Sequence, residues 1–334
     1  MDTLPDALSR TLLFAVVLVL AGSVAWRAFL CPRLKVGGQA EISGDTWARM
    51  ERRSGLVALL AAVLLLPALL LRLWTQVREF RDPFVPFSED LAFILRDTFW
   101  GTAWTGQLAL ALLLPPLFLL VVRGAGSSPP GSGRRPADLA EGESPLAEWP
   151  GPWLATGAGV ALLALGLSLQ SHAMSMSPAA RPLGLTLDWA HQMAAGAWVG
   201  TIVMVLAASP APTDPGGPPR SRLLALQFQA FRPLAMVAVA LMVFAGTILA
   251  SGHMAGPADL WTTEWGRTLS AKVAVALAAV GVGAWNAQRG VPGLVRTGRS
   301  APLSRAVALE LGLALLVLVL TALQVTPPQP PRGH

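Results

Sequence analysis

Eight apolar runs, each about as long as a bilayer is thick, dominate this sequence. We place them at residues 11–30, 55–76, 102–122, 153–171, 183–208, 231–251, 268–287 and 304–325. A helix needs about 20 apolar residues to cross a hydrocarbon core of about 30 Å. Hydrophobic residues make up 53% of the chain and charged residues 13%, unlike a soluble domain. The sequence therefore predicts an all-α, polytopic membrane helical bundle with eight transmembrane helices.

The distribution of basic residues predicts the orientation of this bundle. The segment before the first run carries two aspartates and one arginine, so it lacks the positive n-region of a signal peptide. The loops after spans one, three, five and seven hold 16 of the 25 Lys and Arg residues. Because positively charged loops stay in the cytoplasm, both termini and the loops near residues 85, 177 and 260 should lie outside.

Histidines and methionines gather on the predicted outer side. His172, Met174 and Met176 alternate in the polar segment "SHAMSM", and His253 and Met254 follow span six. An extended backbone would direct residues 172, 174 and 176 to one side. Imidazole and thioether donors together suit copper, above all Cu(I), because a soft ion prefers nitrogen and sulfur to oxygen. A zinc site with three histidines would leave the thioethers unused.

Other sulfur-containing residues have ordinary explanations. We interpret Met204, Met236 and Met242 as packing residues, since methionine fills irregular gaps between helices. The single cysteine, Cys31, lies on the predicted cytoplasmic side, so one copy of the chain forms neither a disulfide nor a cysteine-based metal site.

Ionisable residues inside predicted spans are candidates for function. His191 lies about eight residues into span five, about 12 Å along the helix axis. Asp188 is three residues earlier, so it shares a face with His191 and is expected to accept its ring proton, as carboxylates do beside metal-bound imidazoles. Lys272 in span seven lies at a comparable depth and is expected to pair with Asp188. The pair either locks two helices together or takes part in transfer.

Glu310 is a further ionisable residue, about two turns from the inner end of span eight. Two interpretations remain open. Its carboxylate pairs with Arg305 or Arg289, or it marks an inner exit site for a cation.

Two segments of the chain resemble each other. "LRDTFWGTAWTGQLALALL" at 95–113 and "LWTTEWGRTLSAKVAVALA" at 260–278 share Thr-x-Trp-Gly at an offset of 165 residues. Since four spans would make up each half, the halves would be a 4+4 parallel internal repeat. Gln107 stands at the place of Lys272, and spans one to four contain no histidine. The first half therefore has the composition of a scaffold.

Composition also divides the chain and excludes some functions. We predict an N-terminal transmembrane region at 1–122, a disordered cytoplasmic linker at 123–152, a transmembrane domain at 153–327 and a disordered tail at 328–334. The net charge of +6 is explained by anchoring to the inner leaflet of the lipid bilayer, since no basic stripe interleaved with aromatics indicates nucleic-acid binding. No phosphate loop, nucleophile elbow or HExxH motif indicates an enzyme or an energised pump.

Five segments of the second half form an ordered set: "SHAMSM", "LDWAHQMAAGAWVG", "FRPLAMVAVALMVFAGTILASG", "WTTEWGRTLSAKVAVALAAVGVGAWNAQR" and "LSRAVALELGLALLVLVLTALQVTPP". In these segments the chain resembles the copper resistance D (CopD) family of bacterial inner-membrane proteins, over roughly residues 155–327. The resemblance implies copper transport across the cytoplasmic membrane, with a soluble periplasmic copper carrier as donor. It implies His172 and His191 as ligands and Asp188 and Lys272 as support, whereas the methionines and His253 rest on the chemical argument above.

These observations predict a copper-transport protein that captures Cu(I) at the outer His/Met site and passes it inward through His191. Two alternatives use the same residues. In a haem-binding redox protein, two of the histidines would be axial ligands. In a membrane copper chaperone for oxidase assembly, the metal would be delivered without net accumulation.

Overall fold

A computed structural model of the chain describes residues 3–37, 42–125, 151–171, 174, 176–209, 218–252 and 254–324. The predicted tail and nearly all of the predicted linker lie outside these residues. His172 and His253 do as well, so their places in the predicted site stay predictions.

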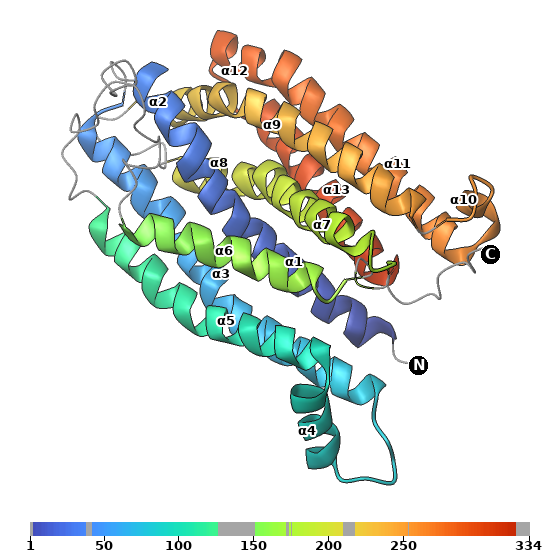
Figure 1. The fold of residues 1–334 in the computed structure, drawn as a ribbon. Coiled ribbons are helices and arrows are strands. Elements are labelled where there is room, and N and C mark those ends of the chain that lie inside the picture. The colour runs from blue at the N-terminus through green and yellow to red at the C-terminus, as the bar shows by residue number, and fades with distance from the viewer. Residues whose placement is uncertain are drawn as a thin grey trace.

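The described residues form helices without any strand, and eight helical stretches are long and apolar enough to cross a membrane (Figure 1). They confirm the predicted all-α bundle of eight spans. The stretches are Leu4–Lys35, Gly44–Glu79, Phe99–Gly124, Gly151–Ser168, Arg181–Ala208, Arg220–Ser251, Glu264–Thr297 and Ala301–Gln324. Most are longer than the apolar runs, because a helix continues into the interface until a capping residue or a turn stops it.

Five of the spans are single helices, and two short helices precede spans at one end of the bundle. The single helices are α3 (Gly44–Glu79), α5 (Phe99–Gly124), α6 (Gly151–Ser168), α9 (Arg220–Ser251) and α13 (Ala301–Gln324). The short helices are α4 (Phe87–Asp97) before α5 and α10 (Asp259–Thr262) before the seventh span. We call the end of the bundle that carries α4 and α10 the predicted outer end (Figure 1).

The first, fifth and seventh spans each contain a π-helical segment, which the sequence did not predict. They run α1–η1–α2 (Thr3–Ala25, Trp26–Leu30, Cys31–Gly37), α7–η5–α8 (Arg181–Ala195, Gly196–Gly200, Thr201–Ala208) and α11–η6–α12 (Glu264–Trp285, Asn286–Gly290, Val291–Thr297). Such widened turns frequently occur at functional sites. Each segment contains a Trp or Asn whose side chain hydrogen-bonds to a residue of another helix. Trp26, for example, donates to Gln227.

Helix α1 lies in the middle of the bundle and packs against α3, α6, α13 and η5 (Figure 1). Glycines permit the close approach to η5. A Cβ on Gly200 would overlap the carbonyl oxygen of Leu18, and one on Gly22 would overlap the backbone of Gly200. Two hydrophobic clusters flank this contact, and one of them joins α6 to α1, α3 and α5. The first three spans therefore pack closely with α6, which the sequence assigned to the other domain.

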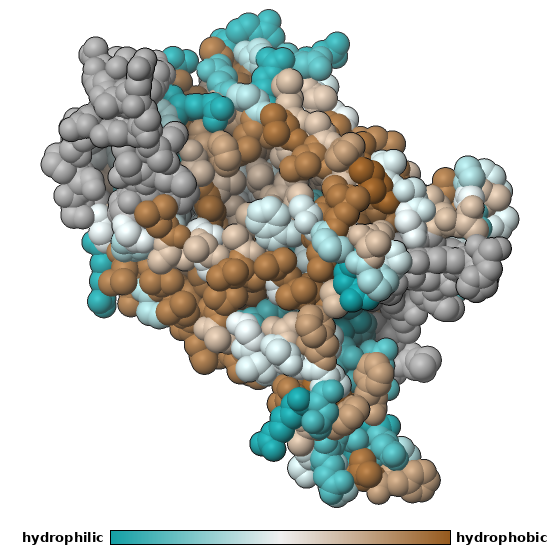
Figure 2. Space-filling view, viewed as in Figure 1, coloured by the Kyte–Doolittle hydropathy of each residue, from teal (hydrophilic) through white to brown (hydrophobic). Residues whose placement is uncertain are grey.

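Helix α11 is the span with the least buried apolar surface, and its principal partner is α13. Large apolar side chains on several spans point outward, including Leu112, Leu162, Val237 and Leu277. Figure 2 shows such residues across the middle of the visible face, with hydrophilic residues gathered toward its ends. This distribution is the one a bilayer requires.

The two Thr-x-Trp-Gly segments have the same local structure. Thr98 and Thr263 are the N-caps of α5 and α11, and their hydroxyls accept the backbone N–H of Gly101 and Gly266, each at 3.0 Å. Each threonine hydroxyl also donates to a carbonyl of the preceding short helix. In both glycines a Cβ would collide with that helix. The local motif is thus repeated, whereas a repeat of whole halves stays a prediction.

Candidate functional site

His191 lies on α7 and faces α9. Its Nδ1 is 2.9 Å from the carbonyl oxygen of Met242, which only accepts hydrogen bonds, so Nδ1 carries a proton. The lone pair of a neutral ring is then on Nε2, which is free to bind a metal. Gly246, one turn further along α9, makes room for the ring, since a Cβ there would lie 3.1 Å from Cε1. The ring is half-buried, ten residues from the start of α7.

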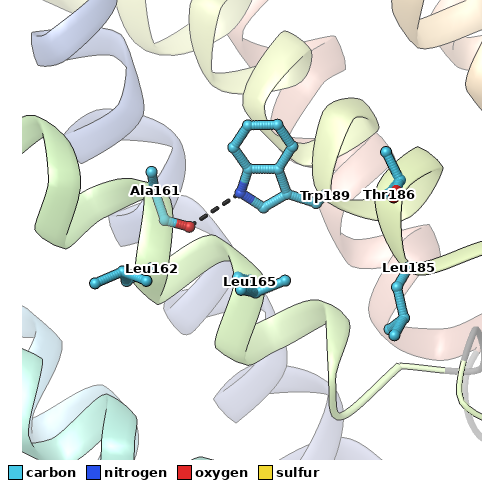
Figure 3. Close-up of a pocket in the computed structure, with 6 residues that line it drawn as sticks. All are labelled: Ala161, Leu162, Leu165, Leu185, Thr186 and Trp189. Carbon is cyan, nitrogen blue, oxygen red and sulfur yellow. Dashed lines mark hydrogen bonds between the residues drawn. The ribbon is translucent and has the colours of Figure 1, made fainter. Parts of the chain in front are cut away.

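The opposite side of α7 is fixed to α6. The indole N–H of Trp189 donates to the carbonyl oxygen of Ala161 at 3.0 Å (Figure 3). Because residues two apart on a helix point in nearly opposite directions, this contact directs His191 toward α9. An apolar pocket of about 260 Å³ adjoins the indole, lined by Ala161, Leu162, Leu165, Leu185, Thr186 and Trp189. It contains no ionisable side chain and is separate from the candidate site.

Asp188 is not the hydrogen-bond partner of His191, contrary to the prediction. Its carboxylate accepts the side-chain N–H of Gln192 at 2.8 Å, and the same amide donates to the hydroxyl of Ser168 at 2.9 Å. The carboxylate therefore turns toward the end of α6, and the carbonyl of Met242 takes its expected place on the imidazole.

Lys272 lies on α11, and its charge acts on both Asp188 and His191. The predicted ion pair with Asp188 is nevertheless wrong as a direct contact, because no such pair within 4 Å occurs among the described residues. The reason is the packing of the helices. Since α11 packs chiefly on α13 and α7 chiefly on α9, Lys272 and Asp188 lie on helices that are not close neighbours.

The structure describes three methionines at the predicted outer end, Met174, Met176 and Met254. The backbone N–H of Met174 donates to the carbonyl of Ser171 at 3.1 Å. His172 lies outside the described residues, so the extended alternation of residues 172, 174 and 176 stays a prediction. Met176 reaches the end of α9, where a Cβ on Gly252 would lie 3.2 Å from its methyl group. Met254 follows two residues after Gly252 and is half-buried. The described residues contain no group of three or more His, Cys, Asp and Glu side chains placed to hold a metal ion.

Glu310 lies in a second polar cluster, in the half of the bundle away from the predicted outer end. The indole N–H of Trp198 donates to Oε1 at 3.1 Å, and the amide of Asn286 donates to Oε2 at 2.8 Å. Neither Arg305 nor Arg289 forms an ion pair with it in the part of the chain that the structure describes. The sequence analysis missed Trp198 and Asn286. Asn286 could have been found, because an asparagine within an apolar run is unusual.

Comparison with known proteins gives one family match. Residues 225–324 match the family model described as copper resistance protein D. The resemblance to CopD, predicted over roughly residues 155–327, is confirmed over residues 225–324. The match runs from α9 to the end of α13 and includes Lys272, Asn286 and Glu310, whereas Asp188 and His191 precede it. No curated protein and no solved structure matches the chain. The CopD match and the eight apolar helices of the chain together support a multi-pass membrane protein of copper resistance or transport.

Proposed function

We propose that this protein moves copper inward across the bacterial inner membrane. Cu(I) is captured from the periplasmic side by Met174, Met176 and Met254 with His172 and His253. It then passes to His191 and moves inward by exchange of ligands. A soluble periplasmic copper carrier is the donor, and the protein carries out no catalytic step.

The observation that supports this route is the position of two donors along one helix. Met176 contacts α9 at Gly252, and His191 contacts it at Gly246 and at the carbonyl of Met242. The two glycines are six positions apart in sequence, which corresponds to about 9 Å along the axis of α9. A metal–nitrogen bond is only about 2 Å long. Met176 and His191 therefore suit two successive sites better than one coordination sphere.

The chemistry of His191 also favours metal binding. A backbone carbonyl that holds Nδ1–H is the usual support of an imidazole that binds metal through Nε2. The positive charge of Lys272 opposes the arrival of a cation, and the carboxylate of Asp188 counters it. Copper at His191 would thus enter a region where one negative and one positive group already offset each other.

The test begins with metal analysis and an absorption spectrum of the detergent-purified protein. We compare it with His191→Ala and with Thr186→Ala, a control on the same helix whose hydroxyl bonds only to a carbonyl of its own helix. The expected result is colourless protein that binds copper, with copper lost in His191→Ala and retained in the control. A Soret band that disappears in His191→Ala would make His191 a haem ligand and end the proposal.

Transport is tested next in vesicles loaded with a Cu(I) chelator. We expect accumulation with the wild-type protein and with Thr186→Ala, and none with His191→Ala. Copper binding without any accumulation would instead fit a membrane copper chaperone.

A further inference from the structure

Glu310, Asn286 and Trp198 form a buried polar cluster that the copper route does not use. Glu310 and Asn286 are each 4% exposed and Trp198 6%. Glu310 lies nine residues into α13, about 14 Å along the helix axis. Gly283 leaves room for the carboxyl group, because a Cβ there would lie 2.8 Å from Oε1. The cluster joins α13 to η5 and η6, the π-helical segments of the fifth and seventh spans.

Among the described residues, no cation forms an ion pair with the carboxyl group. The ionisable groups on nearby elements include Arg305 on α13, Arg289 in η6, Lys272 on α11, His191 and Asp188 on α7, Asp6 and Arg10 on α1, Arg232 on α9 and Arg27 in η1. None forms an ion pair with Glu310 within the described residues, and Arg27 instead lies 3.5 Å from Glu51. The side chains that hydrogen-bond to Glu310 in the described part of the chain are two neutral donors, Trp198 and Asn286. An unpaired carboxylate inside a membrane is expensive, so it favours uptake of a cation.

Asn286 is suited to both states of a carboxyl group that gains and loses a proton. Its amide nitrogen donates to Oε2, while its Oδ1 is buried and has no hydrogen-bond partner. Rotation of the amide by about 180° would exchange the two atoms, since an amide offers donors on one side and an acceptor on the other. The nitrogen serves the carboxylate, and the oxygen would accept the O–H of the acid. The rotation breaks no hydrogen bond of Oδ1, because this atom has no partner before the rotation.

The donor set decides which cation fits. Carboxylate and amide oxygens are hard donors, and no thioether or imidazole of the described residues forms a hydrogen bond or ion pair with them. Cu(I) prefers soft sulfur and nitrogen donors. We propose that Glu310, supported by Asn286 and Trp198, is a proton-binding site inside the membrane and not an exit site for copper.

The step is balanced without a further reactant. The carboxylate of Glu310 takes one proton from water, the amide of Asn286 rotates to accept the new O–H, and the reverse returns the proton to water. Trp198 has no such second role, because an indole N–H only donates. It therefore supports the ionised state more strongly than the protonated one.

The test is pH-dependent infrared difference spectroscopy of the purified, copper-free protein in lipid. It does not depend on the proposed copper route. We expect a carboxylic C=O band that appears on acidification and is absent from Glu310→Gln. Glu51→Gln, the same change at the Arg27 pair, is the control and should retain the band. A Glu310 band that is present at every pH, or at none, would overturn the proposal.

A second variant separates a proton site from a structural hydrogen bond. Trp198→Phe removes a donor that favours the carboxylate, so the midpoint of the band should move to higher pH by about 1 to 2 units. An unchanged midpoint would contradict the assigned role of Trp198 and Glu310. Copper bound per protein should be the same in Glu310→Gln as in the wild type, and loss of one equivalent would make the cluster a copper site instead.

Discussion

Gly246 offers a precise way to perturb His191 without removing it. In Gly246→Ala the new Cβ would lie 3.1 Å from Cε1 and 3.4 Å from Nδ1 of the ring. These distances are tighter than ordinary contact, so the ring must shift by a few tenths of an ångström. The shift acts on the 2.9 Å hydrogen bond to the carbonyl of Met242.

The magnitude follows from the strength of that bond. A hydrogen bond of this kind contributes about 1 kcal/mol net, which corresponds to a factor of about 5 in an equilibrium constant. If the bond is lost, the ring is free to rotate and copper affinity at His191 should fall by about 5-fold. Stability should change little, because alanine is favoured over glycine in a helix by up to about 1 kcal/mol and this offsets the crowding.

The assay is competition for Cu(I) with a coloured chelator in detergent, together with thermal unfolding. Gly281→Ala is the matched control, since it makes the same change in the transmembrane helix α11 with nothing within 4 Å of the new methyl group. Copper affinity should fall in Gly246→Ala alone. Equal affinities in the two variants and the wild type would refute the role given to the hydrogen bond with Met242.

Two further predictions concern packing and capture. Gly200→Ala places a methyl group on the backbone of α1 at Leu18 and should lower the free energy of unfolding by about 1 to 3 kcal/mol, seen as a lower midpoint of thermal unfolding, whereas Gly312→Ala should not. Met176→Leu keeps the volume of the side chain but removes the thioether, so Cu(I) capture at the predicted outer end should weaken. Met236→Leu, at a side chain 63% exposed, is its control, and equal capture by both would argue against a thioether ligand.

The fold was predictable because the bilayer imposes a simple rule on sequence. Apolar runs of membrane length had to become helices, and all eight did. The π-helical segments were not predictable, because a run such as "GAWVG" satisfies the same rule whether its turns are ordinary or wide. Their occurrence depends on contacts with other helices, such as that of Gly200 with Leu18.

The contacts of the candidate residues differ from those that the sequence predicted. His191 became a candidate because an ionisable residue is unusual in an apolar span. Its partner was wrong, since sequence spacing shows that Asp188 shares a face with it but not that the carbonyl of Met242 lies nearer. The ion pair of Asp188 with Lys272 failed for a related reason. Similar depth in two spans does not make those helices neighbours, and α11 packs on α13.

The N-cap of α11 at Thr263 also influences the position of Lys272 in the membrane. This helix packs chiefly on α13, and most other residues of its apolar stretch are not buried. The N-cap at Thr263, together with the contact of Gly266 against α10, holds its first turn to a short helix at the end of the bundle. Lys272 follows nine residues later, about 14 Å along the axis. The contact with α10 therefore fixes where α11 begins, and with it the depth of Lys272 in the bundle.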